Sequence, residues 1–277
     1  EAEKRLVHYV GQAASSKEPE QQAGMAEALM VLSQMAQNQG QFERANQWLA
    51  QMPQGADPLR LASRQADLLA RQGRMDEARL VLAQIKTSTP EQARQKTLLQ
   101  SQWLREHRQA ETAYTLMQTA LGETPQNAEL ISEMALVCEK LKRFEEMERL
   151  LRQLIELKPQ DPHAFNALGY SLADRGIRLD EARLLITQAL SFTPQDAYIQ
   201  DSLGWVSYRQ GRLQEARQIL QTAYKARPDA EIAAHLGEVL WSAGKTQEAA
   251  TIWREGLLLK ADNETLLETI QRFQFKP

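Results

Sequence analysis

The chain has 277 residues, of which 43% are hydrophobic and 25% charged, and its formal net charge is −3. This composition is typical of a folded protein and excludes a chain that is disordered throughout. The lack of a basic excess argues against a nucleic-acid partner, and no apolar run approaches the roughly 20 residues that span a membrane.

The first 25 residues are expected to form a leading helix and a polar linker that contains Ser15-Ser16-Lys17-Glu18-Pro19. The chain begins at Glu1 and not at a methionine, so we expect that processing or the choice of a fragment produced this start. Any targeting segment would have been lost with the residues before it. The single cysteine, Cys138, rules out an internal disulfide and leaves the redox compartment open.

From residue 26 onward, four series of residues recur at intervals of about 34 residues. Prolines are spaced by 35, 34, 35 and 34 residues at Pro90, Pro125, Pro159, Pro194 and Pro228. Glycines recur at Gly40, Gly73, Gly176, Gly211 and Gly244, and alanines at Ala45, Ala78, Ala113, Ala182, Ala216 and Ala249. A fourth series is small throughout and comprises Ser33, Ala66, Ser101, Ala135, Gly169, Gly204 and Gly237.

This periodicity predicts a stack of helical hairpins, each with a helix A of about 14 residues, a short turn and a helix B. Small residues let the two helices approach closely, glycine leaves helical geometry in the turn, and proline ends helix B. The predicted units span residues 26–58, 59–93, 94–127, 128–161, 162–196, 197–229 and 230–263, within an array that covers 26–263. Residues 264–277 are expected to form a capping helix and a tail.

The sixth unit resembles the tetratricopeptide repeat through Leu203-Gly204, Gly211-Arg212-Leu213, Glu215-Ala216, Ala223 and Pro228. The resemblance implies an all-α fold, a right-handed superhelical solenoid of seven hairpins with flanking terminal helices. Two units depart from the pattern. The fourth has Lys142 in place of glycine, and Met147 and Leu154 in place of alanine; the fifth has one extra residue near Ile177, which predicts a longer turn.

No motif predicts catalysis, a cofactor or a metal site. The four histidines, His8, His107, His163 and His235, lie in different units without metal-ligand spacing, so we interpret them as surface or partly packed residues. Cys138 occupies a core position of a helix A, which favours a buried hydrophobic role over a nucleophilic one. Gly244-Lys245-Thr246 resembles the end of a phosphate-binding loop, but Val239 stands where that motif needs its first glycine, and no strand precedes it.

In the tetratricopeptide family, helix A lines the concave groove, which implies groove-facing residues at set positions of each unit. For units five to seven these candidate partner-binding residues are His163, Asn166, Tyr170, Tyr198, Asp201, Trp205, Tyr208, Arg209, Glu238 and Trp241. For units one and two they are Glu27, Met30, Gln34, Gln37, Asn38, Arg60, Ser63, Asp67 and Arg71. Tryptophan, tyrosine and arginine are enriched in binding hot spots, so the C-terminal set is the favoured partner site.

Two alternatives to this site are weighed. The C-terminal aromatic residues could pack against one another or against the capping helix and so stiffen that end of the array. A carboxylate clamp for chaperone tails would need a lysine four residues before Asn166, where Pro162 stands, so this reading is disfavoured.

The runs Asn166–Asp174, Asp201–Arg209 and Ala233–Trp241 further resemble the tetratricopeptide lipoproteins of Gram-negative outer membranes, which face the periplasm. This resemblance covers about 162–260. It implies a non-catalytic adaptor that delivers substrates to a periplasmic carboxy-terminal processing protease, with a membrane link only through a missing N-terminal lipid anchor. The alternatives are an assembly factor for a pilus or secretion system, and a regulatory domain of a larger enzyme. The expected partner is a protein or peptide in each case.

Overall fold

The computed structural model describes residues 1–276, and in this range it contains 16 α-helices and no β-strand, as the all-α prediction requires. The chain divides into two compact units, Glu1–Arg143 and Phe144–Pro277, which are described separately. The first contains α1 (Ala2–Ala13), α2 (Pro19–Asn38), α3 (Phe42–Leu49), α4 (Pro58–Arg71), α5 (Met75–Ala83), α6 (Pro90–Glu106), α7 (Ala110–Glu123) and α8 (Ala128–Lys140). The second contains α9 (Phe144–Leu157), α10 (Pro162–Asp174), α11 (Leu179–Phe192), α12 (Ala197–Arg209), α13 (Leu213–Ala226), α14 (Ala230–Ser242), α15 (Thr246–Leu259) and α16 (Glu264–Arg272).

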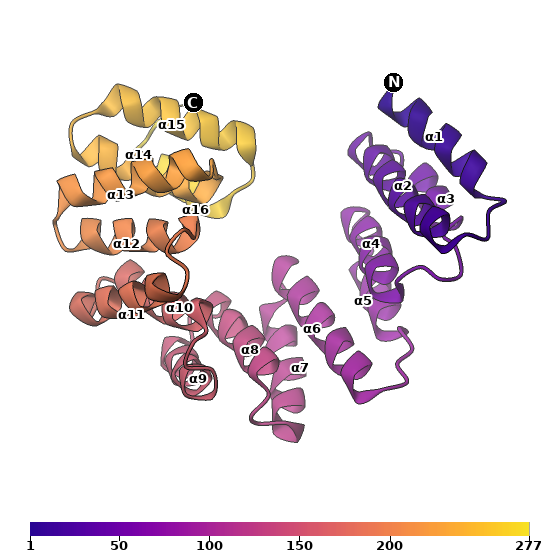
Figure 1. The fold of residues 1–277 in the computed structure, drawn as a ribbon, viewed down its shortest axis with the longest axis horizontal. Helices are drawn as coiled ribbons and strands as arrows, with labels where there is room; N and C mark the ends of the chain where they lie inside the picture. Colours follow the sequence, from indigo (N-terminus) through magenta and orange to yellow (C-terminus); the bar gives the residue numbers. More distant parts are fainter. Residues whose placement is uncertain (277) are drawn as a thin grey trace. The chain divides into compact units, whose positions relative to one another are not determined.

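Within each unit, successive helices run antiparallel and form hairpins (Figure 1). Helices α2 to α15 are the fourteen helices predicted for the seven repeats, and α1 and α16 are the flanking helices. The fourth repeat is divided between the two units, because α8 belongs to the first and α9 to the second. One boundary differs from expectation: α2 begins at Pro19, because the proline occupies the first turn of a helix, where its missing N–H is not needed. The polar linker is therefore shorter than the sequence predicts. Among the described residues, no helix combines the length and the hydropathy needed to cross a bilayer.

The turns between helices A and B are three residues long in six hairpins, and the middle residue of each has a positive φ. Glycine fills most of these positions because it adopts left-handed geometry without steric cost. Arg108 and Lys142 adopt the same geometry, with φ of 60° and 57°. The turn between α10 and α11 has four residues, 175–178, which confirms the prediction of an extra residue near Ile177.

Each helix A from α4 onward begins with a side-chain cap. The capping side chain accepts a hydrogen bond from a backbone N–H in the first turn, which satisfies one of the unpaired donors at a helix start. The caps are Asp57, Thr89, Asn127, Asp161, Asp196 and Asp229, and Asn263 caps α16 in the same way. These residues form a fifth periodic series, which the sequence analysis missed.

Small residues lie where helices A and B touch, as predicted. A Cβ atom added to Gly204 would lie 2.5 Å from Cγ of Leu220, and one added to Gly237 would lie 2.1 Å from Nε1 of Trp253. The facing alanines, Ala216 and Ala249, are fully buried. The close approach of the two helices therefore depends on the absence of side-chain bulk at these positions.

Candidate functional site

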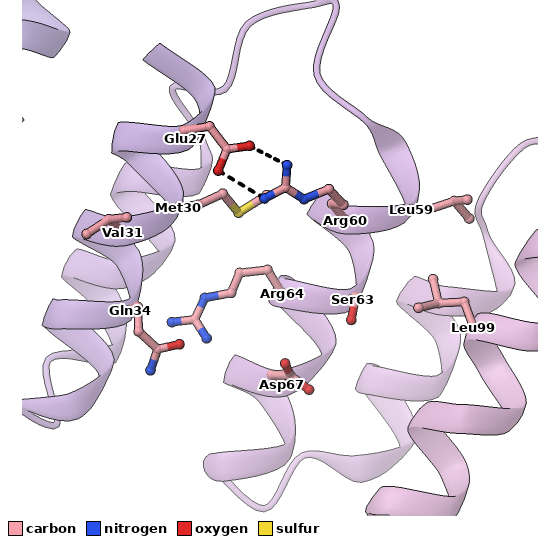
Figure 2. Close-up of a pocket in the computed structure, with 10 residues that line it drawn as sticks. All are labelled: Glu27, Met30, Val31, Gln34, Leu59, Arg60, Ser63, Arg64, Asp67 and Leu99. Atoms are coloured by element: carbon pink, nitrogen blue, oxygen red, sulfur yellow. Dashed lines mark hydrogen bonds and ion pairs between the residues drawn. The ribbon is translucent and has the colours of Figure 1, made fainter. Parts of the chain in front are cut away.

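The N-terminal unit contains an open pocket of about 460 Å³ between α2 and α4, with one wall residue from α6 (Figure 2). Its lining residues are Glu27, Met30, Val31, Gln34, Leu59, Arg60, Ser63, Arg64, Asp67 and Leu99. Six of them belong to the groove-facing positions predicted for units one and two. The sequence analysis named these six as groove-facing but did not favour them as the partner site, because they include no aromatic residue.

An ion pair links α2 and α4 at the pocket. The guanidinium of Arg60 donates two hydrogen bonds to the carboxylate of Glu27, with 3.0 Å between Nη2 and Oε2 for one of them. Both side chains are exposed, and the hydrogen bonds from Arg60 lower the pKa of Glu27. The carboxylate of Glu27 is therefore already occupied by a cation from this chain.

Arg64 lies in the middle of the pocket and points from α4 toward α2 (Figure 2). The side chain is half-buried, and within the described residues its shielded Nε and Nη2 atoms have no hydrogen-bond acceptor. Burial lowers the pKa of the guanidinium, against the opposing effect of Asp67. Arginine nevertheless remains charged in proteins, so the pocket holds a cation with unused donors.

Asp67 is held by residues on and just after α6. Its Oδ1 accepts a hydrogen bond from Nε1 of Trp103 at 2.9 Å, and Nε2 of His107 lies 3.8 Å from the same oxygen. The indole and imidazole rings stack at 4.0 Å. Burial raises the pKa of Asp67, although the hydrogen bond from Trp103 opposes this effect. The carboxylate is thus fixed by its neighbours at one end of the pocket.

The favoured C-terminal site is packed more tightly than expected. Trp205, Asp201 and Glu238 are only 3%, 4% and 5% exposed. The indole of Trp205 stacks on the imidazole of His235 at 4.4 Å, and Nδ1 of His235 lies 2.8 Å from Oδ2 of Asp201. The expectation that these groove positions are exposed is therefore wrong, because adjacent A helices fill the space between them with side chains.

His235 was interpreted as a surface or partly packed residue, but it is 2% exposed and lies at the centre of this cluster. Oη of Tyr170 on α10 approaches its Nε2 at 3.4 Å. Burial is the largest single effect and by itself would lower the pKa of His235, but the carboxylates of Asp201, Glu231 and Asp174 together raise it above its ordinary value. The cluster thus joins α10, α12 and α14 through one buried imidazole.

Residues near the C-terminus of the chain cover the ring of Trp241. Its ring stacks on Trp253 at 5.4 Å and meets Phe273, which follows α16, at 5.9 Å. The Arg272 guanidinium of α16 pairs with the carboxylate of Glu238, whose pKa burial raises despite that cation. Trp205 and Trp241 therefore follow the alternative prediction for the aromatic residues. Trp205 packs on neighbouring rings, and Trp241 packs on Trp253 and on Phe273 beside the terminal helix.

The remaining predicted residues are more accessible. Tyr198 is 39% exposed, and its ring lies 4.7 Å from the guanidinium carbon of Arg227. His163 is exposed, while the half-buried members are Asn166, Tyr170, Tyr208 and Arg209. Nη1 of Arg209 donates to the backbone carbonyl of Asp174 at 2.5 Å. The partner-binding role of this set stays a prediction.

Cys138 and the Gly244-Lys245-Thr246 run lie outside these two regions. Cys138 is fully buried in α8. Within residues 1–276, no group of three or more histidine, cysteine, aspartate or glutamate side chains could hold a metal ion. Gly244 and Lys245 lie in the turn between α14 and α15, and Thr246 begins α15.

Comparisons with known proteins agree with the repeat geometry. Two family profiles, each described as tetratricopeptide repeat, match residues 104–169 and 202–263. The chain is 39% identical over 207 residues to the TPR repeat-containing protein PA4667 of Pseudomonas aeruginosa. The match covers 75% of this chain but only 35% of that protein, so the chain spans about a third of the relative's length.

Two solved structures show the same fold at low sequence identity. A tetratricopeptide-repeat protein from Parabacteroides merdae is 18% identical with a TM-score of 0.64, covering 89% of this chain and 97% of its own. Yeast Tom70 is 15% identical with a TM-score of 0.69, covering 98% of this chain and 57% of its own. Proteins with this repeat generally act as non-catalytic scaffolds for protein or peptide partners. The periodic hairpins, the two profile matches and the related sequence together show that this chain is a tetratricopeptide-repeat protein.

Proposed function

We propose that the chain is a non-catalytic scaffold that holds a segment of a partner protein in the pocket between α2 and α4. The observation that supports this proposal is the half-buried guanidinium of Arg64, whose Nε and Nη2 lack an acceptor among the described residues, in a pocket that is open to solvent. A guanidinium that lines an open pocket favours a ligand that carries hydrogen-bond acceptors or negative charge. In the C-terminal unit, the groove positions Trp205, Asp201 and Glu238 are instead buried by neighbouring side chains.

The identity of the partner rests on the resemblance to envelope lipoproteins. On that basis the chain is an adaptor at the periplasmic face of the outer membrane, and it delivers substrates to a carboxy-terminal processing protease. An assembly factor for an envelope machine would use the same pocket with a different partner.

Site-specific photocrosslinking tests the position of the partner site. A photoreactive residue replaces Val31, a pocket residue that is 46% exposed, and the protein is irradiated in envelope extract. We expect one or a few discrete crosslinked proteins, which mass spectrometry identifies as a protease, its substrates or components of an assembly machine.

The matched control carries the same photoreactive residue at Leu184, which is 72% exposed on α11 and lies in the other unit. We expect only diffuse background from this position. Equal labelling from Val31 and Leu184 would show that the pocket is not the partner site.

A further inference from the structure

A buried imidazole in the C-terminal unit contacts two other A helices. Helix α10 packs on α12 and α12 packs on α14, so the three A helices are stacked in succession (Figure 1). His235 on α14 is 2% exposed, and its Nδ1 lies 2.8 Å from Oδ2 of Asp201 on α12. Its Nε2 lies 3.4 Å from Oη of Tyr170 on α10, which is two repeats away. One side chain therefore links three successive repeats.

The partners of His235 depend on its charge. Asp201 is 4% exposed, and within the described residues its second carboxylate oxygen, Oδ1, has no hydrogen-bond partner. The indole of Trp205 covers one face of the imidazole at 4.4 Å, and the ring of Tyr170 approaches it at 5.9 Å. A buried carboxylate is costly unless a cation and hydrogen bonds compensate it. An imidazolium supplies that cation, whereas a neutral imidazole leaves the charge of Asp201 uncompensated.

The groups around His235 favour its protonated form. Titratable and charged side chains face it or its carboxylate neighbours from every element packed around it. They are Tyr170 and Asp174 on α10, Asp201 and Arg209 on α12, Glu231 and Glu238 on α14, Lys260 after α15, and Arg272 on α16. Burial by itself would lower the pKa of His235, but the carboxylates of Asp201, Glu231 and Asp174 together raise it above its ordinary value.

We propose that His235 is a proton-controlled clamp that sets how closely α10, α12 and α14 pack. The imidazolium attracts Asp201 and donates to Tyr170, which holds the three helices together. When the ring loses one proton to solvent, Asp201 stays charged without a cation, and the helices move apart so that water reaches its carboxylate. The clamp is therefore closed at acidic pH and opens as pH rises through the titration of His235. The inference concerns helix spacing in a folded unit and does not depend on the pocket between α2 and α4.

Spin labels at two exposed positions measure this spacing in the full chain. His163 lies at the start of α10 and Ser242 at the end of α14, and both are replaced by cysteine. The native Cys138 is fully buried, so it does not take the label in the folded protein. Dipolar electron paramagnetic resonance gives the distance between the labels. We expect one narrow distance at about pH 5, and a distance longer by about 2 Å at about pH 9.

Substitutions assign the response to one side chain. His235→Gln keeps a hydrogen-bonding group that cannot take up a proton, and we expect the longer distance at both pH values. Asp201→Asn removes the buried charge, and we expect a distance that no longer depends on pH. The matched control is His107→Gln in the N-terminal unit, because His107 also stacks on a tryptophan, at 4.0 Å, and lies 3.8 Å from the carboxylate of Asp67. This control should keep the full response.

A second measurement follows the proton itself. Nuclear magnetic resonance of the imidazole groups gives the titration midpoint of His235, whose signal is identified by its loss in His235→Gln. We expect a midpoint above the ordinary value of 6.5 that coincides with the midpoint of the distance change. Circular dichroism verifies that each variant is folded at both pH values, and Asp201→Asn decides the question if His235→Gln does not fold.

Several results would overturn the inference. One is an equal distance at both pH values in the folded parent, and another is a His235 midpoint below 6.5. A response that persists in folded His235→Gln or Asp201→Asn protein would assign the change to other groups, such as Glu231 and Glu238, whose pKa burial raises. Loss of the response in His107→Gln would show that it does not arise in the cluster around His235.

Discussion

The groove-facing positions of the A helices differ in burial between the two units. In the C-terminal unit they include Trp205, Trp241 and Asp201, which are wholly or largely buried by neighbouring helices and by residues at the C-terminal end. In the N-terminal unit they include Glu27, Ser63 and other polar residues, and an open pocket remains between α2 and α4. The same repeat geometry thus supports a packed groove at one end and an accessible one at the other.

This difference predicts that one set of side chains stabilises the fold and the other is free to contact a partner. Side chains that fill a groove contribute to folding, and their deletion leaves cavities. Side chains that line an open pocket contribute little to folding and remain available to a partner. Variants at matched positions in the two units therefore test whether packed side chains stabilise the fold and pocket side chains do not.

The largest expected effect is in the packed groove. Trp205→Ala should lower the free energy of unfolding by about 3–5 kcal/mol, because it deletes a buried aromatic ring that stacks on His235. Urea unfolding followed by circular dichroism measures the change. The control Tyr198→Ala removes a ring that is 39% exposed, and should cost only about 0.5–1 kcal/mol. Similar midpoints for the two variants would mean that Trp205 does not support the fold.

A smaller effect on stability is expected when a single methyl group is added at a glycine. Gly237→Ala should destabilise by about 1–3 kcal/mol, since the new Cβ would meet the fully buried Trp253 at 2.1 Å. Gly122→Ala in α7 has no atom within 4 Å of its Cβ, so helix propensity should stabilise it by up to about 1 kcal/mol. Thermal melts of both variants should shift in opposite directions, and a shift of the same sign would contradict the helix contact.

The buried imidazole predicts a pH dependence. Burial lowers the pKa of His235, but the nearby carboxylates, of which Asp201 acts most strongly, together raise it above its ordinary value of 6.5. The protonated pair therefore stabilises the fold below about pH 6.5, and this contribution is lost as pH rises through the raised pKa. Asp201→Asn should reduce the stability difference between acidic and alkaline pH by about 1–2 kcal/mol. Denaturant midpoints across the pH range measure it.

The exposed His163 supplies the control for this pH profile, because His163→Gln removes an imidazole outside the buried cluster. The His163→Gln protein should keep the parent's pH dependence. A flat profile for the parent protein, or an unchanged profile for Asp201→Asn, would show that His235 and Asp201 do not act as a coupled pair.

The smallest expected effect on folding is in the open pocket. Arg64→Met should change the free energy of unfolding by no more than about 0.5 kcal/mol, because the lost charge has no partner in the fold. Arg105→Met is the comparison within the same unit, since Arg105 pairs with the buried carboxylate of Glu133 at 3.2 Å. That variant should cost about 1–3 kcal/mol. A large loss for Arg64→Met would make Arg64 a structural residue and weaken the contrast between the two grooves.

Much of the fold was predictable because its signals are local. Proline and glycine at intervals of about 34 residues mark helix ends and turns, since both act through the backbone of their own segment. The same holds for the small residues between helices A and B, such as Gly169 opposite Ala182. The capping series, for example Asp161 and Asp196, carries an equally local signal that composition and apolar periodicity do not reveal.

The candidate site was less predictable than the fold. The position of a residue within its repeat shows only from which face of the helix its side chain leaves, and not whether neighbouring residues bury that side chain. Trp205 and Arg60 occupy groove positions by the same rule, yet one is buried and the other exposed. The aromatic C-terminal set was favoured because aromatic residues are enriched in binding hot spots. Large rings also fill space in a protein interior, where they pack against side chains of a neighbouring helix. Arg64 lies outside the predicted groove positions, and only its side-chain path in three dimensions carries its guanidinium into the pocket.

Local sequence patterns are sufficient to predict the repeat, its hairpins and its turns, because these follow from backbone preferences and helical periodicity. Tertiary structure alone decided which groove is open. His235 reaches Trp205 and Asp201 from the next helix A, and Phe273 reaches Trp241 from beyond α16, so burial there depends on residues about 30 positions away. Around Arg64 no described side chain from a neighbouring helix fills the space between α2 and α4, and the pocket stays open.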